Sequence, residues 1–581
     1  MAEKKKTAVW KNFLHLIRQI KLPLVLLAAA FVLNIGRAVI QLTVPEKIAG
    51  LTELDLAGGS TIMKAVIASC VLIFVLALIE FVVGLASTYI TYIAKARINR
   101  DFQTVAARKV FSLTTAEVEA RDPKEFISRI TTDIGFVSDF LIDLLVIEVP
   151  RLYFLISTMI KVSQMGNGTL AIGFIVVIPV IVLGSFWSGR VTYKAQSKLQ
   201  TAIARLTAKL AEKVEHPEII KAYNKTEDEI ASGDVYIDEM KKAQKKTTLA
   251  AAFNQLIANI LFVVPTLIIM LFGAVPLLAG GITLAQYITY FGLGANYQKY
   301  IADHLTLWVL AKKAQGATLR ISEIMLLEED KGGADKAEKT GDLSFDNVSF
   351  SLGGKKILDQ VSFSVKDGSK FAIVGESGSG KSTLLNLIEQ FYRPGEGTIT
   401  LDGVNVQDYE ISSYRGLFSY LPQNAPGFSG TVRDFLTYGS KKTFTEDELK
   451  AMLEKVDMLG TIEEMGGLDY EVGQEAGRLS GGQRQRLAVA RMLLSDARIV
   501  LADEATSALD IRGTRKIADL IDEHAKGKTR ILVAHNLATV KDADAILVLD
   551  HGRVAGLGTH EELIRTCPAY TRLLAAGEEV A

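Results

Sequence analysis

The chain has 581 residues, and its 65 Lys and Arg balance its 65 Asp and Glu, so its formal net charge is zero. This length predicts two or more folding units, and the balance of charge argues against a nucleic-acid partner. Two cysteines, Cys70 and Cys567, exclude a disulfide scaffold and a thiolate zinc site. A hydrophobic content of 49 % and a mean hydropathy of +0.24 exclude a disordered chain and indicate membrane spans.

The two parts of the chain differ in charge. Residues 1–330 hold 35 Lys and Arg against 28 Asp and Glu, whereas residues 331–581 hold 30 against 37. The formal charge is therefore +7 in the first part and −7 in the second. This difference predicts two domains in different surroundings.

Long apolar runs fill the first 330 residues. A helix needs about 20 apolar residues to cross a bilayer. The sequence contains 28 uncharged residues between Lys161 and Arg190, and 52 between Lys246 and Lys299, where Gly280-Gly281 marks a turn between two spans. We predict six spans, in residues 22–44, 63–92, 136–160 and 162–189, with two in 247–298. A soluble helical core and a cleaved signal peptide are the disfavoured alternatives.

Charge also predicts the topology of the first part. Residues 95–132 and 190–246 are long and rich in Lys and Arg, as is the N-terminal segment 1–21, so all three are expected in the cytoplasm. Apolar residues at helical spacing in 200–219 predict that the spans continue as helices beyond the bilayer. Breaks are expected at Asp122-Pro123 and His216-Pro217. A short helix at each tip would suit docking to a soluble domain.

Several ionisable residues fall inside the apolar runs. Placing one such side chain in contact with lipid would cost a free energy of about 2.5–3.5 kcal/mol on insertion scales. They indicate a polar cavity or a substrate path, although pairing between helices or a position near an interface is the alternative. The candidates for this substrate cavity are Arg37, Glu80, Asp143, Glu148, Arg151, Asp303 and His304.

A charged segment follows the spans. Residues 323–342, with Glu328, Glu329, Asp330 and Lys331 followed by two glycines, are predicted to link a transmembrane domain at 22–322 to a second domain at 343–578. Short β-rich runs alternate with helical patterns in the second domain, which is typical of an α/β fold.

A glycine-rich loop lies between a predicted strand at 371–374 and a predicted helix at 384–388. This context fits a phosphate-binding P-loop. Its glycines let backbone N–H groups approach phosphates, and the helix N-terminus adds positive potential. Lys381 would reach the β- and γ-phosphates of ATP and Ser382 would bind Mg²⁺, while a Gly-Ser loop with a chance lysine is the alternative. The loop comprises Gly375, Glu376, Ser377, Gly378, Ser379, Gly380, Lys381, Ser382 and Thr383.

A second apolar strand at 498–502 ends in two acidic residues. Asp503 is in position to hold Mg²⁺, and Glu504 is in position to polarise the attacking water. Many strands end in acids, so the P-loop makes this interpretation the favoured one. Glu504 is the predicted catalytic base.

A second glycine-rich helix start follows Leu479, ahead of a predicted helix at 484–494. One chain needs no second cradle for one γ-phosphate. Two chains that face head to tail would use it, because this loop would then close over the P-loop of the other chain. The predicted ATP-binding residues in trans are Ser480, Gly481, Gly482 and Gln483.

Taken together, residues 343–578 resemble the ATPase domain of ATP-binding cassette (ABC) transporters, since Leu479–Gln483 matches the ABC signature. The resemblance implies that Gln423 contacts ATP and Mg²⁺ and senses the membrane domain, and that His535 contacts the γ-phosphate as a catalytic residue. It also implies a D-loop at the dimer interface, formed by Ser507, Ala508, Leu509 and Asp510. The sequence departs from the family at Leu352, where an aromatic residue usually stacks on adenine.

The whole chain resembles an exporter-type half-transporter. This implies a helical membrane domain with six transmembrane helices and long cytoplasmic extensions, followed by an α/β P-loop ATPase domain. ATP and Mg²⁺ are the expected cofactors, and the expected partners are the lipid bilayer and a second half-transporter chain. A homodimer is favoured, because all hydrolytic motifs are present in one chain, while a heterodimer stays open.

The cargo is not encoded in a motif. Ionisable residues in the spans favour export of a polar or amphipathic solute, such as a drug-like compound or a small peptide. A lipid flippase, an importer with the same fold and a regulatory ATPase that transports nothing are the alternatives. The expected location is a bacterial cell membrane, with several spans and a cytoplasmic ATPase domain.

Overall fold

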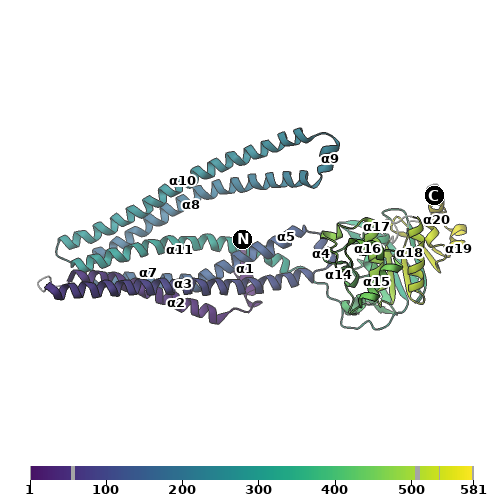
Figure 1. Cartoon of the computed structure of the whole chain (residues 1–581), viewed down its shortest axis with the longest axis horizontal. Helices are drawn as coiled ribbons and strands as arrows, with labels where there is room; N and C mark the ends of the chain where they lie inside the picture. Colours follow the sequence, from purple (N-terminus) through teal and green to yellow (C-terminus); the bar gives the residue numbers. More distant parts are fainter. Residues whose placement is uncertain (1, 54–58, 504–510, 535–536, 579–581) are drawn as a thin grey trace. The chain divides into compact units, whose positions relative to one another are not determined.

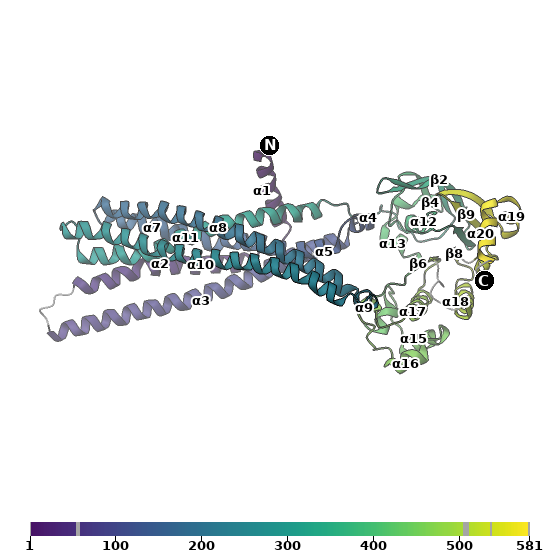
Figure 2. The same ribbon diagram turned by 90° about the horizontal axis from the view of Figure 1, so that it is seen from above.

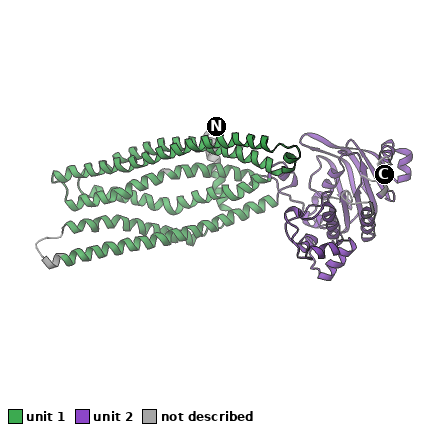
Figure 3. Cartoon of the chain, turned by 45° about the horizontal axis from the view of Figure 1, so that its top comes forward, with its two compact units in different colours: residues 1–111, 123–326 green, residues 112–122, 327–581 purple. Residues whose placement is uncertain are grey.

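The protein forms two compact units. The computed structural model describes residues 2–53, 59–503, 511–534 and 537–578. Unit 1 comprises Met1–Phe111 and Pro123–Leu326, and unit 2 comprises Ser112–Asp122 and Leu327–Ala581 (Figure 3). The segment Ser112–Asp122 therefore belongs to unit 2, although in sequence it lies between two helices of unit 1.

Unit 1 is helical throughout its described residues. The helical segments are α1 (Ala2–Arg18), α2 (Leu24–Ala49), η1 (Gly50–Glu53), α3 (Gly59–Phe111), α5 (Pro123–Ser128), η2 (Arg129–Asp133), α6 (Ile134–Ile142), η3 (Asp143–Glu148), α7 (Val149–Gln164), α8 (Gly168–Glu215), α9 (Pro217–Ala222), α10 (Thr226–Leu278) and α11 (Leu284–Met325). Both η2 and η3 are π-helical, and such segments often occur at functional positions.

Four helices of unit 1 are long and apolar enough to cross a membrane, within the described residues. They lie in Leu24–Thr52, Met63–Phe111, Gly168–Glu215 and Thr226–Leu278. The predicted count of six spans is therefore not confirmed. The span expected at 136–160 lies in α6, η3 and α7 and contains four charged residues. The last expected span lies in α11, whose uncharged stretch ends at Lys299.

The predicted turns and breaks lie where the sequence placed them. α10 ends at Leu278 and α11 begins at Leu284, so Gly280-Gly281 lies in the turn. α8 ends at Glu215, and the six-residue helix α9 begins at Pro217. Figures 1 and 2 show α8 and α10 side by side along much of their length, joined by α9 at one end.

Close approach between helices depends on small residues. A Cβ on Gly173 of α8 would lie 2.3 Å from the Tyr290 hydroxyl and 2.8 Å from Cβ of Phe272. Next to it, the Phe174 ring packs edge to face on Tyr290 and on Tyr297 of α11, with ring centroids 5.0 and 4.5 Å apart. Small residues that let helices approach are characteristic of packing in membranes.

Unit 2 contains two sheets. An antiparallel sheet has the order β2-β1-β4-β5, and a second sheet has the order β10-β9-β3-β8-β7-β6, parallel except for β10. The strands are β1 (Leu343–Leu352), β2 (Lys355–Val365), β3 (Lys370–Gly375), β4 (Glu396–Leu401), β5 (Val404–Asn405), β6 (Phe418–Leu421), β7 (Ile499–Asp503), β8 (Thr529–Val533), β9 (Ala545–Asp550) and β10 (Arg553–Gly558).

Helices surround the parallel sheet. They are α4 (Thr115–Glu119), α12 (Lys381–Ile388), η4 (Val406–Asp408), α13 (Ile411–Arg415), α14 (Val432–Thr437), α15 (Glu446–Lys455), α16 (Leu459–Met465), η5 (Gln474–Ala476), α17 (Gly481–Leu493), α18 (Ile511–His524), η6 (Leu537–Thr539), α19 (His560–Thr566) and α20 (Pro568–Glu578). Both β3 and β7 are buried along their whole length, as expected for strands in a parallel sheet covered on both faces.

A buried carboxyl group lies directly behind the P-loop helix. Glu389 follows α12, is 5 % exposed, and its Oε1 has no hydrogen-bond partner among the described residues. Burial raises the pKa of the Glu389 carboxyl to about 7, and the nearby Arg415 lowers it only in part. The folded state therefore holds this proton more tightly than the unfolded chain does.

We predict that Glu389→Gln stabilises the protein at pH 8 and not at pH 4.5. A pKa raised in the folded state makes folding less favourable as pH rises from the unfolded value toward about 7, and at pH 8 the full penalty corresponds to about 3 kcal/mol. The thermal unfolding midpoint of the solubilised full chain measures this effect. Glu396→Gln, at an exposed position in β4, is the control, and an equal shift in both variants would contradict the prediction.

Candidate functional site

The P-loop connects β3 to α12, as the sequence predicts. Gly378 and Gly380 have φ values of +80° and +105°, which L-residues with a side chain rarely adopt. A Cβ on Gly375 would lie 2.2 Å from the carbonyl oxygen of Leu549 in β9. Backbone conformation therefore requires glycine at 378 and 380, and the lack of space for a Cβ requires it at 375 and 380.

Lys381 lies inside this loop. Its side chain is buried, and its ammonium group donates to the carbonyl oxygens of Gly375 at 2.9 Å and Glu376 at 3.0 Å. Ser379 is also buried, and its hydroxyl has no partner among the described residues. The other loop residues, Glu376 to Gly378 and Ser382, are exposed. A cation held within a loop at a helix N-terminus suits a phosphate group.

Two further predicted residues lie at the carboxyl edge of the parallel sheet. Asp503 is the last residue of β7 and is 3 % exposed, and Gln423 lies two residues beyond β6, exposed to solvent. β6 pairs with β7, and β7 with β8, which neighbours β3, so these residues and the P-loop emerge at the same edge. Oxygen donors from a serine, a carboxylate and an amide suit Mg²⁺.

The signature segment forms the start of α17. Ser480 is its N-cap: the Ser480 hydroxyl accepts from the N–H of Gln483 at 3.2 Å, and the Gln483 side chain accepts from the N–H of Ser480 at 2.8 Å. This capping box fixes the turn, while Ser480 and Gly481 remain exposed. The second glycine-rich helix start is thus present and accessible.

Leu352 ends β1 at a tight hairpin. It pairs with Lys355 across Gly353-Gly354, whose φ values are +58° and +80°. Its side chain is 47 % exposed, so it offers a small apolar surface at the position expected to face adenine. The predicted residues Glu504, Ser507, Ala508, Leu509, Asp510 and His535 lie outside the described residues.

The tip segment Ser112–Asp122 packs within unit 2. Glu119, at the end of α4, accepts a hydrogen bond from the Tyr392 hydroxyl, and the ring of Tyr392 stacks on Phe350 of β1 at 5.1 Å. The backbone of Asp330 also donates to the carbonyl of Ser112 at 2.7 Å. The tip expected to dock on a soluble domain therefore contacts the residues that follow the P-loop helix.

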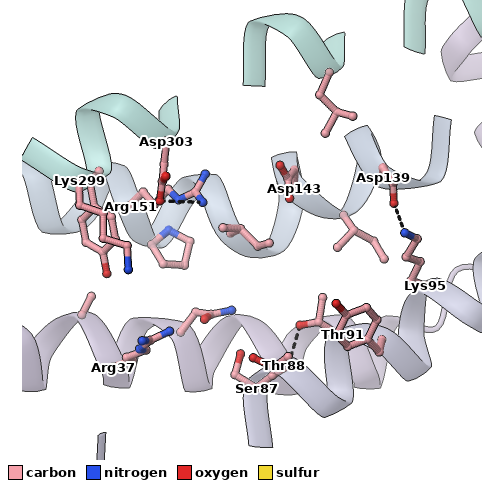
Figure 4. Close-up of a pocket in the computed structure, with 18 residues that line it drawn as sticks. Arg37, Ser87, Thr88, Thr91, Lys95, Asp139, Asp143, Arg151, Lys299 and Asp303 are labelled. Carbon is pink, nitrogen blue, oxygen red and sulfur yellow. Dashed lines mark hydrogen bonds and ion pairs between the residues drawn. The ribbon is translucent and has the colours of Figure 1, made fainter. Parts of the chain in front are cut away.

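Unit 1 contains a polar cavity of about 460 Å³, shown in Figure 4. Residues from α2, α3, α6, η3, α7 and α11 line it. Of the seven predicted cavity residues, Arg37, Asp143, Arg151 and Asp303 line this space. Glu80, Glu148 and His304 do not.

These three residues are instead paired with others. Glu80 accepts from Nε of Arg37 at 2.9 Å. Glu148 is 3 % exposed and contacts Arg151 at 3.3 Å and the Nδ1 atom of His304. The two interpretations of the ionisable residues therefore overlap, because Arg37, Arg151 and Asp303 line the cavity and also form ion pairs.

A second, apolar groove of about 450 Å³ lies in unit 1. His304 and Tyr297 are the lining residues of this groove that carry polar side-chain atoms. Because Glu148 contacts both His304 and Arg151, it touches one lining residue of the groove and one of the polar cavity. The apolar lining residues include Leu152, Leu155, Ile156, Met159, Ile178 and Ile301.

Sequence reasoning missed three charged residues of the polar cavity. Lys95, Asp139 and Lys299 line it, whereas the sequence pattern places Lys95 in a cytoplasmic segment and Lys299 at the end of an apolar run. A helical signal was present, because Lys299 precedes Asp303, and Asp139 precedes Asp143, by four residues each. Residues at this spacing share one face of a helix.

Family models match both parts of the chain. A model described as the ABC transporter transmembrane region matches residues 26–295, and one described as ABC transporter matches residues 358–507. The chain therefore belongs to the ABC transporter family. It is an integral membrane protein with several spans, its unit 2 contains the ATP-binding domain, and it couples ATP hydrolysis to transport.

The chain is also similar to individual proteins over most of its length. The ATP-dependent lipid A-core flippase of Mannheimia succiniciproducens is 28 % identical over 97 % of this chain and 96 % of its own length. The flippase of the same description from Pseudomonas aeruginosa is 30 % identical over 82 % of this chain and 79 % of its own length. Such bacterial relatives agree with the expected location in a bacterial cell membrane.

One solved structure has the same fold. A bacterial Atm1-family ABC exporter with ATP bound has a TM-score of 0.80 at 23 % identity, over 95 % of this chain and 98 % of the other. This similarity confirms the predicted fold class, a helical membrane domain followed by an α/β ATPase domain.

We predict that Gly380→Ala weakens ATP binding by about tenfold or more, since a left-handed Ala costs about 1–2 kcal/mol. Its Cβ would also lie 2.7 Å from a methyl group of Leu358. The affinity of the solubilised chain for a fluorescent ATP analogue measures the effect. Gly403→Ala is a matched control, because Gly403 has φ +78° with no atom within 4 Å of an added Cβ. Equal affinities in the two variants would argue against the P-loop assignment.

We predict that Tyr392→Phe reduces the stimulation of ATPase activity by transported substrate by about threefold to tenfold and leaves basal turnover in place. The variant loses the hydrogen bond to the Glu119 carboxylate, and a bond to a charged group contributes about 1.5–3 kcal/mol. Tyr409→Phe loses a hydroxyl that donates to Leu401 at 3.2 Å, away from the tip segment, and should keep full stimulation. If both variants are stimulated like the parent chain, the tip contact has no role in coupling.

Proposed function

We propose that this protein is an ATP-driven lipid flippase, which moves an amphiphile with a polar headgroup and apolar chains across the bilayer. The observation that carries the proposal is the pairing, in unit 1, of a polar cavity with an apolar groove through Glu148. A lipid needs both environments at once, whereas a uniformly polar solute would need only the first.

The relatives support a lipid over a drug-like compound or a small peptide. The flippases of M. succiniciproducens and P. aeruginosa align with most of this chain, and their descriptions name a lipid as the transported molecule. The exporter of drug-like or peptide cargo favoured from sequence is therefore the second candidate. We also propose that α6 to α7 and α11 cross the membrane with the four apolar helices, which completes six spans.

For the ATPase reaction we propose two cassettes facing head to tail. Each ATP would lie between residues 375–383 of one chain and Ser480 to Gln483 of the other, whose exposed α17 N-terminus is free to approach it. Lys381 would hold the phosphates, and Leu352 would lie against adenine. Glu504 would polarise the attacking water, while His535 would orient the γ-phosphate and residues 507–510 would contact the second chain.

The oxygen donors of Ser382, Gln423 and Asp503 would hold Mg²⁺, which when bound neutralises phosphate charge. Among the residues described, no cluster of three or more His, Cys, Asp and Glu could hold a metal alone. This fits an ion held largely by the nucleotide. A homodimer is proposed, because one chain carries every element of the composite site.

The transport step would follow from a shift in population. ATP must bind the closed pair of cassettes more tightly than the open pair, so that binding closes them. The tip segment, held to unit 2 by Glu119 and Tyr392, would pass this change to α3 and α5, to which the chain connects it directly. Hydrolysis would then reopen the pair.

The decisive experiment compares the full chain with its Glu504→Gln variant in proteoliposomes. We expect ATP-dependent movement of a fluorescent phospholipid between leaflets, together with vanadate-sensitive ATP turnover. The variant should still bind ATP and lose both activities by about a hundredfold or more, as for loss of a group that acts in the transition state. Turnover unchanged by the substitution would overturn the catalytic assignment, and turnover with no lipid movement would overturn the flippase proposal.

A further inference from the structure

The charges of the polar cavity are almost balanced. The charged side chains that line it are Arg37, Lys95, Arg151, Lys299, Asp139, Asp143 and Asp303. Four are cations and three are carboxylates, so a simple count suggests a site for an anion. The pairing of these groups with one another, and with carboxylates just outside the cavity, changes that conclusion.

Three of the four cations are already neutralised. Arg37 is paired with Glu80 outside the cavity, and Lys95 is paired with Asp139. The guanidinium of Arg151 is shared between Glu148 at 3.3 Å and Asp303 at 3.4 Å. Figure 4 shows the pair with Asp303. A bound anion would have to compete with a carboxylate for each of these cations, and the displaced carboxylate would lose its partner within the membrane helices.

Two charged side chains remain, and their signs are opposite. Within the described part of the chain, neither Lys299 of α11 nor Asp143 of η3 makes an ion pair or a side-chain hydrogen bond. In Figure 4 the Arg151–Asp303 pair lies between them, and both belong to the lining of the same cavity. Asp143 also begins a π-helical segment, which departs from regular α-helical hydrogen bonding in that turn.

We infer that the polar cavity takes the headgroup of a zwitterionic lipid, with its anionic group on Lys299 and its cationic group at Asp143. Such a headgroup neutralises both remaining charges and leaves the three internal pairs intact. A headgroup with several negative charges would form a favourable contact with Lys299 alone, and the Asp143 carboxylate would repel it. This inference rests on the proposed flippase function and specifies its substrate class.

The test uses the full chain in vesicles of digalactosyldiacylglycerol, a lipid without charge. Trace phosphatidylcholine or phosphatidylglycerol, each labelled with a fluorophore on an acyl chain, reports ATP-dependent movement between leaflets through quenching by dithionite. We expect phosphatidylcholine, the zwitterionic probe, to move about tenfold faster than the anionic probe, as for one additional charged contact.

Two substitutions separate the two contacts. Lys299→Gln should slow the movement of phosphatidylcholine between leaflets by about tenfold. Asp143→Asn should slow the movement of phosphatidylcholine to a similar degree and should speed the movement of phosphatidylglycerol. Lys312→Gln is the matched control, because it removes a cation from the same helix outside the cavity lining and should change neither rate. ATP turnover without lipid, measured in parallel, shows whether each variant is folded.

The possible failures are distinguishable. If phosphatidylglycerol moves as fast as phosphatidylcholine or faster, the zwitterionic assignment is overturned and the flippase function stands. Variants that leave the preference unchanged overturn the roles of Lys299 and Asp143. If ATP is hydrolysed and neither probe moves, the proposed function fails and this inference fails with it.

Discussion

A charged side chain within apolar helices is stable only beside a counter-charge or in a wet space, and this constraint organises unit 1. Arg37 and Glu80 lie on α2 and α3, and Arg151 is held by Glu148 on its own helix and by Asp303 on α11. Each pair fixes the rotation of its helices about their axes, since a turn of either helix would leave a charge in lipid. The cavity is the space that these oriented helices enclose.

The same pairs give the cavity its chemical character. Because most cations are held in ion pairs, the electrostatic preference of the site depends on the two lining charges that make no ion pair among the described residues, Lys299 and Asp143. Glu148 links this polar space to an apolar groove through His304. An amphiphile could therefore place its headgroup and its chain in neighbouring environments without exposing either to the wrong solvent.

Unit 2 is organised by a different constraint, because a phosphate site requires several backbone N–H groups and a cation at a fixed position. Gly375 and Gly380 allow the chain to pass close to Leu549 and Leu358, and Lys381 is held inside the loop by two carbonyl oxygens. Tyr392 lies shortly after this helix in the chain, and its hydroxyl donates a hydrogen bond to Glu119 in the tip segment. The site for phosphate and the connection to the membrane helices are thus separated by little more than one short helix.

The sequence by itself determined several features that depend on local order along the chain, although not the π-helical segments η2 and η3. Periodicity, glycine spacing and proline breaks predicted the P-loop between β3 and α12, the glycine-rich helix start after Leu479, the turn at Gly280-Gly281 and the helix break at Pro217. Apolar length predicted six membrane spans, and four of them lie in helices that are long and apolar enough to cross a membrane, whereas α6 to α7 and α11 are not among those four. These features are local because hydrogen bonds within a helix or a turn join residues only a few positions apart.

Only the tertiary structure decided which ionisable residues meet. Arg37 and Glu80 are 43 residues apart, and Glu148 and His304 are 156 apart. Pairing at such distances depends on how helices pack and rotate, which no local pattern encodes. For that reason the sequence did not distinguish Glu80 and Glu148, which pair with other charges, from His304, which lines the apolar groove, and it overlooked Lys95, Asp139 and Lys299 as cavity residues. Whether a charge lines a cavity or neutralises another charge depends on neighbours from distant parts of the chain, and these become neighbours only on folding.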